Sequence, residues 1–275
     1  MKKTICLLML VCLCGCYSKK DPFIEFKQQI AVEDLEVLEN FFEYLLKHTS
    51  FGFTLLGHKP VSYDCYWPPE TSEELQGQRL RYGLLAEGWE VFQKYSYLFP
   101  EKHFMIAKEF NHPISCITLA NKQEVEKVIN KHLNLFREFY GENFSYSQYV
   151  DKLPSVFLEE NHLAGILLGY GARNAWAFHR RSEISSQKPN LMPSSGFSSL
   201  EEELNFINDH RSRFVLENIA DEFTMFTIPA FTSLDDDEEV KELADSYTET
   251  LNVLHDAVSK YSCLQIFYEK FTGRM

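Results

Sequence analysis

Apolar residues recur every three to four positions in six stretches of the chain, the spacing that places side chains on one face of an α-helix. A capping residue followed by Glu three positions later begins three of these stretches, at Thr71, Asn121 and Ser199. The stretch 156–181 is apolar on nearly all sides, which is typical of a buried helix. We therefore expect six helices, over residues 31–48, 71–92, 121–140, 156–181, 199–219 and 235–262.

Shorter apolar segments lie between these helices and predict strands, because turn residues such as Gly, Asn and Pro bound them. The segments are 51–56 with 59–63, 103–110 with 114–120, and 222–231. The two pairs predict hairpins, and hairpins among many helices indicate an α+β fold. We expect a single, mostly helical domain over 23–275, with about six helices around a long buried central helix and a small antiparallel sheet of hairpins.

The loop 183–198 is the longest stretch without a predicted element. It has 16 residues and is rich in Ser and Pro. A loop of this length is long enough to be a lid, a binding loop or a disordered segment.

Charge narrows the range of partners. Lys and Arg number 27 and Asp and Glu number 40, which gives a net charge of -13. Such an acidic surface argues against a nucleic-acid backbone or an anionic lipid face as the main partner, and we predict no nucleic acid partner.

The N-terminus has the three parts of a signal peptide. Lys2 and Lys3 precede an apolar run over 4–13, which is too short for the roughly 20 residues of a membrane span. Leu13-Cys14-Gly15-Cys16 then resembles the lipobox of bacterial lipoproteins. The alternatives are an ordinary secretory signal with an unmodified cysteine, or a buried N-terminal helix.

The lipobox resemblance implies cleavage before Cys16, diacylglycerol on its thiol and acylation of the new amino group. Residues 1–15 are then the signal peptide and 16–22 a short tether, and removal of Lys2 and Lys3 changes the net charge from -13 to -15. Two or three acyl chains hold a protein stably on a membrane. Because the next residue is not Asp, the resemblance implies the cell envelope and favours the outer membrane.

Three cysteines remain in the body of the chain, Cys65, Cys116 and Cys263. An odd number in an exported protein allows one disulfide and one free thiol, or no disulfide. Their spacing matches no metal-binding motif.

The segment 162–176 is the most distinctive part of the body. Gly165 and Gly169 lie on one face of the predicted helix, where small residues admit a ligand or, as we favour, a closely packed helix. Arg173 and Asn174 are polar residues in an apolar helix, so each must be hydrogen-bonded or face a cavity. These four residues form our candidate pocket, with a buried structural hydrogen bond as the favoured alternative for the last two.

Residues 49–63, together with 165–175, resemble an uncharacterised lipoprotein family of chlamydia-type intracellular bacteria. This resemblance supports the envelope location. It implies no activity and no catalytic residue.

Other groups give no catalytic or metal motif. His58, His103 and His112 lie near predicted turns and are better explained as surface residues than as zinc ligands. The acidic run 235–239 opens a helix, where the helix dipole stabilises negative charge. We predict no catalytic residue, no metal and no cofactor.

Tyr140, Tyr146 and Tyr149 are interpreted as core residues, with an exposed interaction patch as the alternative. We expect a non-enzymatic, membrane-anchored envelope protein that binds another envelope component. The alternatives are a lipid-anchored hydrolase or a small-ligand carrier, each with a pocket near 162–176.

Overall fold

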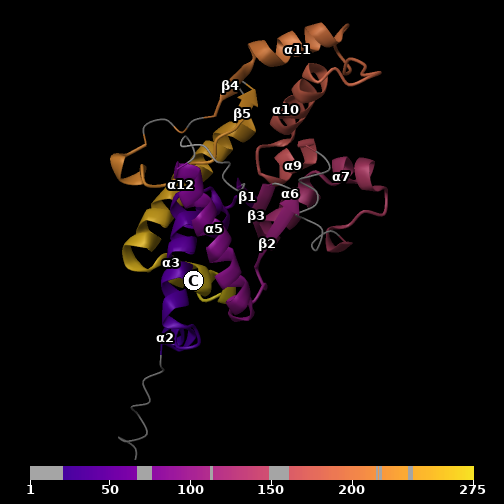
Figure 1. Cartoon of the computed structure of the whole chain (residues 1–275). Coiled ribbons are helices and arrows are strands. Elements are labelled where there is room, and N and C mark those ends of the chain that lie inside the picture. Colours follow the sequence, from indigo (N-terminus) through magenta and orange to yellow (C-terminus); the bar gives the residue numbers. More distant parts are fainter. Residues whose placement is uncertain are drawn as a thin grey trace, which may run out of the picture.

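The computed structural model describes residues 21–66, 76–111, 114–148, 161–214, 216, 219–234 and 238–275 (Figure 1). The α-helices are α2 (Pro22–Lys27), α3 (Val32–Lys47), α4 (Phe51–Leu55), α5 (Gln76–Tyr95), α6 (Lys122–Lys131), α7 (Leu133–Tyr140), α9 (Asn161–Leu167), α10 (Ala172–Ser185), α11 (Leu200–Asp209), α12 (Glu238–Lys260) and α13 (Cys263–Thr272). The strands are β1 (Val61–Tyr66), β2 (Phe104–Asn111), β3 (Ile114–Asn121), β4 (Arg211–Arg213) and β5 (Thr232–Leu234). Short 3-10 turns are η2 (Ser96–Leu98), η3 (Tyr146–Gln148) and η5 (Asp221–Phe223).

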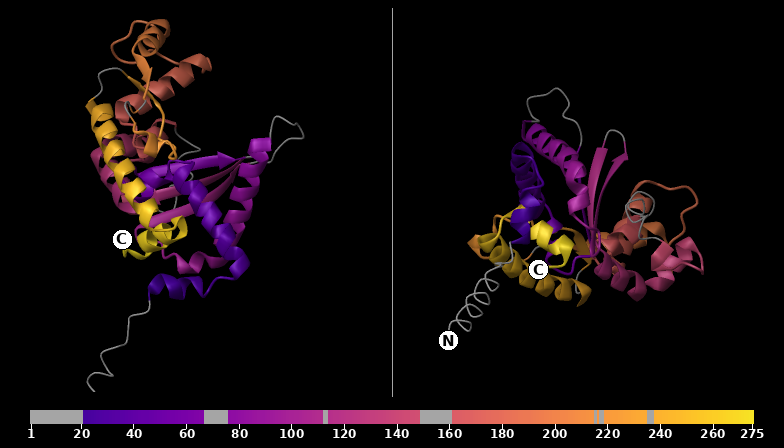
Figure 2. Two further views of the ribbon diagram at one scale, coloured as in Figure 1. Left: turned by 90° about the vertical axis from the view of Figure 1, so that its left-hand side faces the viewer. Right: turned by 90° about the horizontal axis from the view of Figure 1, so that it is seen from below.

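The fold is α+β and mostly helical, as predicted, with small antiparallel sheets. The larger sheet has the strand order β1-β3-β2, and β4 pairs with β5 in a second, two-stranded sheet. The predicted hairpin over 103–120 is confirmed, because β2 and β3 pair antiparallel from Phe104↔Asn121 to Asn111↔Ile114. Seen from below in Figure 2, the larger sheet stands between two groups of helices.

The two faces of the larger sheet belong to two hydrophobic cores. On one face, Ile106, Ile117 and Leu119 join the main core, which α2, α3, α4, α5, α12 and α13 complete. On the opposite face, Val61 and Ala120 join a second core built with α6, α7 and α9. Each fully buried large apolar side chain contributes about 1.5–3 kcal/mol, so both cores hold their helices against the sheet.

Helix α3 follows its sequence pattern closely. Its inner residues are at most 1% exposed and are Leu38, Phe41, Phe42, Leu45 and Leu46. Phe42 packs on Phe267 of α13 with ring centroids 4.3 Å apart. The C-terminal helix α13, which the sequence pattern did not predict, therefore closes the main core.

The predicted long central helix over 156–181 is wrong within the described residues. Helix α9 ends at Leu167 and α10 begins at Ala172. Gly169 and Gly171 both have positive φ, at 79° and 82°, a conformation that glycine adopts readily and that ends a helix. The chain therefore bends between the two helices, which pack against each other.

Contacts from distant segments fix this bend. The Lys59 ammonium donates to the carbonyl of Leu168 at 2.5 Å, where α9 ends. The carboxylate of Glu239, from the predicted acidic run, accepts a hydrogen bond from the backbone N–H of Ala172 at 3.2 Å. The acidic residue thus caps α10 and not only the helix that it opens.

Two strand predictions are wrong. Residues 51–55 form helix α4 instead of a hairpin strand, because all five are buried and the apolar run has no period that distinguishes helix from strand. Strand β1 pairs with the central strand β3 instead. Residues 222–231 hold part of the 3-10 turn η5 and irregular chain, and strand β5 begins only after them, at Thr232.

Two of the three predicted helix caps are confirmed. The side chains of Asn121 and Ser199 accept hydrogen bonds from the backbone N–H groups of Glu124 and Glu202, which confirms both helix starts. The second of these helices ends at Asp209, earlier than expected, because strand β4 follows. The Thr71 cap, the signal peptide 1–15 and Cys16 lie outside the described residues.

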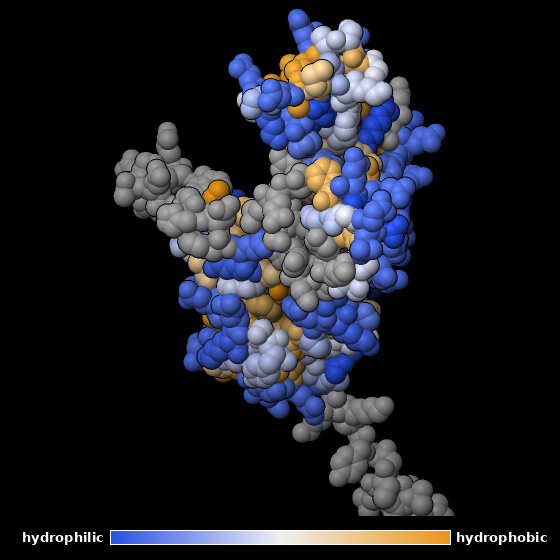
Figure 3. Space-filling view, turned by 90° about the vertical axis from the view of Figure 1, so that its right-hand side faces the viewer, coloured by the Kyte–Doolittle hydropathy of each residue, from blue (hydrophilic) through white to orange (hydrophobic). Residues whose placement is uncertain are grey.

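The surface agrees with the acidic composition. The face in Figure 3 is mostly hydrophilic, and hydrophobic residues show there as separate areas. Across the parts of the chain that the structure covers, we find no helix with the length and apolarity that a bilayer crossing requires.

Candidate ligand-binding site

A cavity of about 880 Å³ opens on the half of the sheet face that the second core leaves uncovered. We call it the sheet cavity. Its sheet wall is formed by Tyr63 and Cys65 of β1, Cys116 and Thr118 of β3, and Glu109 of β2. These residues share one face, because Tyr63 pairs with Thr118 and Cys116 pairs with both Cys65 and Glu109. The volume lies in the usual range of small-molecule sites, about 300–1,000 Å³.

The second wall comes from α9, α10 and the bend between them. Gly165, Leu168 and Asn174 line this wall together with the exposed ring of Phe178. A Cβ atom on Gly165 would stand 2.7 Å from the Cβ of Ala175, so the close packing of α9 on α10 requires glycine here.

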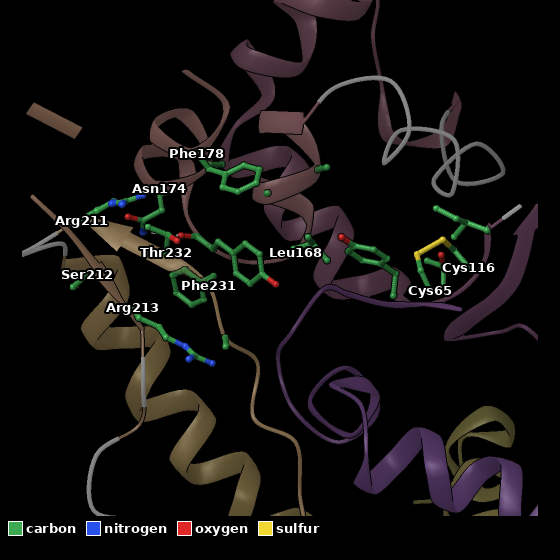
Figure 4. A pocket seen from close by; sticks show the side chains of 18 of the residues that line it. Cys65, Cys116, Leu168, Asn174, Phe178, Arg211, Ser212, Arg213, Phe231 and Thr232 are labelled. Carbon is green, nitrogen blue, oxygen red and sulfur yellow. Dashed lines mark hydrogen bonds between the residues drawn. A yellow bond between two sulfur atoms is a disulfide. The ribbon is translucent and has the colours of Figure 1, made fainter. Parts of the chain in front are cut away.

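The third wall is the two-stranded sheet with the chain that leads into it. Arg211 and Arg213 lie on β4, and Phe231 precedes β5 (Figure 4). Phe231 stacks on Tyr170 at 4.4 Å and on Phe214 at 4.6 Å, with interplanar angles of 17° and 14°. This stack of three rings gives the wall a rigid apolar surface.

A disulfide joins Cys65 of β1 to Cys116 of β3. The Cα atoms of the two cysteines lie 4.1 Å apart. It forms part of the sheet wall and ties an edge strand to the central strand. Cys263 is free and buried, and burial raises the pKa of its thiol to about 12. Of the alternatives that the sequence left open, the structure has one disulfide and one thiol.

The structure brings together only some of the predicted pocket residues. Gly165 and Asn174 line the sheet cavity. Asn174 is 2% exposed, and its amide donates to the carbonyl of Tyr170 and accepts from the N–H of Leu234, both at 2.8 Å. This is the buried structural role that we favoured for it.

Arg173 and Gly169, the other two residues of the predicted pocket, do not line the described cavity. Arg173 is exposed. Gly169 makes the bend, and a Cβ atom there would stand 2.9 Å from the Cδ of Pro60.

Sequence reasoning missed the residues that give the cavity its chemistry. Arg211, Arg213 and Phe231 carry no motif, although the alternation Arg-Ser-Arg is itself typical of a strand with both arginines on one side. Glu109 lies beside the disulfide, and burial raises the pKa of its carboxyl group. Local pattern gave no sign that strand pairing would bring these residues to one cavity.

Lys59 is the most unusual charged residue near the site. It is 2% exposed, its Nζ atom lies 4.9 Å from the centre of the Tyr170 ring, and desolvation lowers the pKa of its ammonium to about 7. Its hydrogen bond to the end of α9 explains its burial, because cations stabilise helix C-termini.

The predicted loop over 183–198 does not cover the cavity with any described lining residue. Its first residues belong to α10, and Ser194 is held by the buried carboxylate of Glu203. The same carboxylate accepts two hydrogen bonds from Arg180, at 2.7 and 2.8 Å. These bonds hold Ser194 against α10 and α11 and argue against the disordered alternative for this loop.

The remaining candidates do not converge on a metal. Within the ranges that the structure describes, no group of three His, Cys, Asp or Glu side chains is arranged to hold an ion. His58 is exposed and lies 3.3 Å from Glu124, and His112 is outside the described residues. Tyr140 and Tyr146 pack on the second core, while Tyr149 is also outside.

We compared the chain with known protein families, curated proteins and solved structures. No family model, no curated protein and no solved structure matches this chain. The functional conclusion therefore depends on the sequence and on the geometry of the sheet cavity.

Proposed function

We propose that the chain is a lipid-anchored protein of the bacterial cell envelope, held at the outer membrane through Cys16. We further propose that its folded part is a non-enzymatic binding module whose ligand occupies the sheet cavity. The observation that carries this proposal is the cavity itself, which leaves half of one sheet face open beside a packed core.

The disulfide supports the envelope location. Disulfides persist in oxidising compartments and are rare in the bacterial cytosol, where thiols stay reduced. The bond between Cys65 and Cys116 is therefore consistent with export by the signal that the N-terminus resembles.

The lining of the cavity favours binding over hydrolysis. The hydrolase alternative needs Arg173 or Asn174 to act beside a histidine or a carboxylate. Arg173 is exposed and does not line the described cavity. The amide nitrogen and oxygen of Asn174 are both hydrogen-bonded to backbone groups. No histidine lines the cavity among the described residues, and the carboxylate in that lining, Glu109, pairs with Cys116 at the end of the cavity away from Asn174 (Figure 4). The geometry thus supports the small-ligand carrier, with a site near the segment that the sequence singled out.

A neutral fluorescent probe tests the cavity. We expect N-phenyl-1-naphthylamine to bind the mature chain carrying Cys16→Ser, which needs no detergent, with the rise in fluorescence typical of an apolar site. Ala230→Trp places a large ring at an exposed position of the cavity lining and should weaken probe binding at least tenfold. Ala220→Trp, also exposed but outside the described lining, is the matched control and should bind like the parent. Equal binding by both variants would refute a ligand site in the cavity.

A further inference from the structure

The sheet cavity is apolar along most of its length. Leu168, Phe178, Ile114 and the face of Phe231 line it, and two of these remain well exposed, Phe178 at 56% and Ile114 at 39%. A hydrophobic ligand that enters the cavity would cover these exposed apolar side chains and remove them from water, which favours binding.

One end of the cavity is cationic. Arg211 and Arg213 lie two residues apart on β4, so both side chains project from the same side of the strand. Both are exposed, and neither has a hydrogen bond or an ion pair to the described residues. In a chain with a net charge of -13, two neighbouring arginines on one side of a strand, with no carboxylate partner among the described residues, favour an anionic ligand.

The carboxylate of the lining lies away from these arginines. Glu109 pairs in register with Cys116, and Figure 4 shows the disulfide at the opposite end of the site from Arg211 and Arg213. The cavity is therefore polarised, with cations at one end, apolar walls between, and an acid at the other end. A ligand with an anionic head at the β4 end fits this distribution in one orientation.

We infer that the sheet cavity binds a single-chain anionic amphiphile, a free fatty acid or a molecule of the same chemistry. The acid group pairs with Arg211 and Arg213, and the hydrocarbon chain lies against Phe231, Leu168 and Phe178. This inference rests on the proposed function, because it names the ligand of that same cavity. A free single chain is the occupant, since a concave volume of about 880 Å³ between three walls has the size of a site for one small molecule.

The test compares two ligands of equal chain length. Palmitate and hexadecanol are titrated against bound N-phenyl-1-naphthylamine on the mature chain carrying Cys16→Ser. We expect palmitate to displace the probe at least tenfold more effectively than hexadecanol. In the double variant Arg211→Gln/Arg213→Gln this preference should fall to about twofold or less, while hexadecanol displacement stays unchanged.

Arg173→Gln is the matched control, because it removes a nearby positive charge that does not line the described cavity. It should keep the preference for palmitate. Equal displacement by palmitate and hexadecanol on the parent, or an equal loss in Arg173→Gln, would overturn the inference.

A second arm separates a free acid from a lipid headgroup. The parent and the double variant are sedimented with vesicles that contain phosphatidylglycerol. Vesicle binding that depends on Arg211 and Arg213, with no displacement of the probe by palmitate, would assign the arginines to a membrane surface and overturn the inference. If the probe binds in the cavity but no ligand preference is found, the proposed binding site survives and only its ligand class fails.

Discussion

Glu203→Gln should lower the free energy of unfolding by about 3 kcal/mol at pH 7, because it removes a buried charge that four hydrogen bonds stabilise. Glu203 is 0% exposed. Its carboxylate accepts from Arg180 at 2.7 and 2.8 Å, and from the N–H and hydroxyl of Ser194 at 3.0 and 2.6 Å. The glutamine has nearly the same shape, so the change tests charge and hydrogen bonding and leaves volume unchanged.

The magnitude follows from the pKa of Glu203. Burial alone raises this pKa, but the bonds from Arg180 and Ser194 outweigh burial and lower it from 4.5 to about 2. This lowering of the pKa corresponds to about 3 kcal/mol of stability that the ionised carboxylate contributes. Since the unfolded state binds the proton more readily, this contribution is complete above about pH 5.5 and is lost as the pH falls toward 2.

Urea denaturation followed by circular dichroism measures the effect. The difference in unfolding free energy between the parent and Glu203→Gln should be about 3 kcal/mol at pH 7 and about 1 kcal/mol at pH 3. Glu201→Gln, an exposed neighbour on α11, is the control and should match the parent within about 0.5 kcal/mol. A gap that is the same at both pH values would contradict the assigned role of the Glu203 charge.

Two further predictions concern the cysteines. The double variant Cys65→Ser/Cys116→Ser should be about 4 kcal/mol less stable than the oxidised parent, from the loop entropy of a 51-residue separation, and dithiothreitol should produce the same loss in the parent alone. Thiols are counted in the mature chain carrying Cys16→Ser, denatured without reduction. One reactive thiol, from Cys263, is expected, and three would show that the disulfide does not form. Cys16→Ser in the precursor should abolish palmitate labelling and processing by the lipoprotein peptidase, while Cys14→Ser keeps both; labelling that persists without Cys16 would exclude it as the anchor.

The elements that the sequence predicted well are those whose determinants are local. Helix α3 buries one periodic stripe, and α6 and α11 begin at side chains that cap their own first turn. Strands β2 and β3 follow each other closely along the chain, so the register of their pairing also depends on neighbours in the chain. Periodicity, capping and short turns suffice for such elements.

The errors occur where distant residues decide the local structure. The apolar pattern over 156–181 continues without a break, yet Lys59 and Glu239 bind the chain at the point where α9 ends and α10 begins. Strand β1 pairs with a partner about 50 residues away, which no turn signal announces. Helix α4 is buried on all sides, so its sequence lacks the alternation that would have separated helix from strand.

The same distinction explains why the candidate site was predicted in part. Asn174 attracted attention because a polar residue in an apolar run must be satisfied, and the structure shows how it is satisfied. Its amide nitrogen donates a hydrogen bond to the carbonyl of Tyr170 in the bend, and its amide oxygen accepts one from the N–H of Leu234 in β5. This one side chain therefore ties the helix wall of the sheet cavity to the strand wall, and its position at the lining follows from that role.

The ligand contacts that we propose involve residues with no local anomaly. Arginine on a short exposed strand and phenylalanine beside it are ordinary in sequence, since exposed arginines and strand aromatics are both common. They become a site only because the bend at Gly169 to Gly171 turns α10 toward β5 and leaves the face of β1 and β3 open beneath. In this chain, the residues that stand out in the sequence build the frame of the cavity. The residues that this frame brings together are those that we propose contact the ligand.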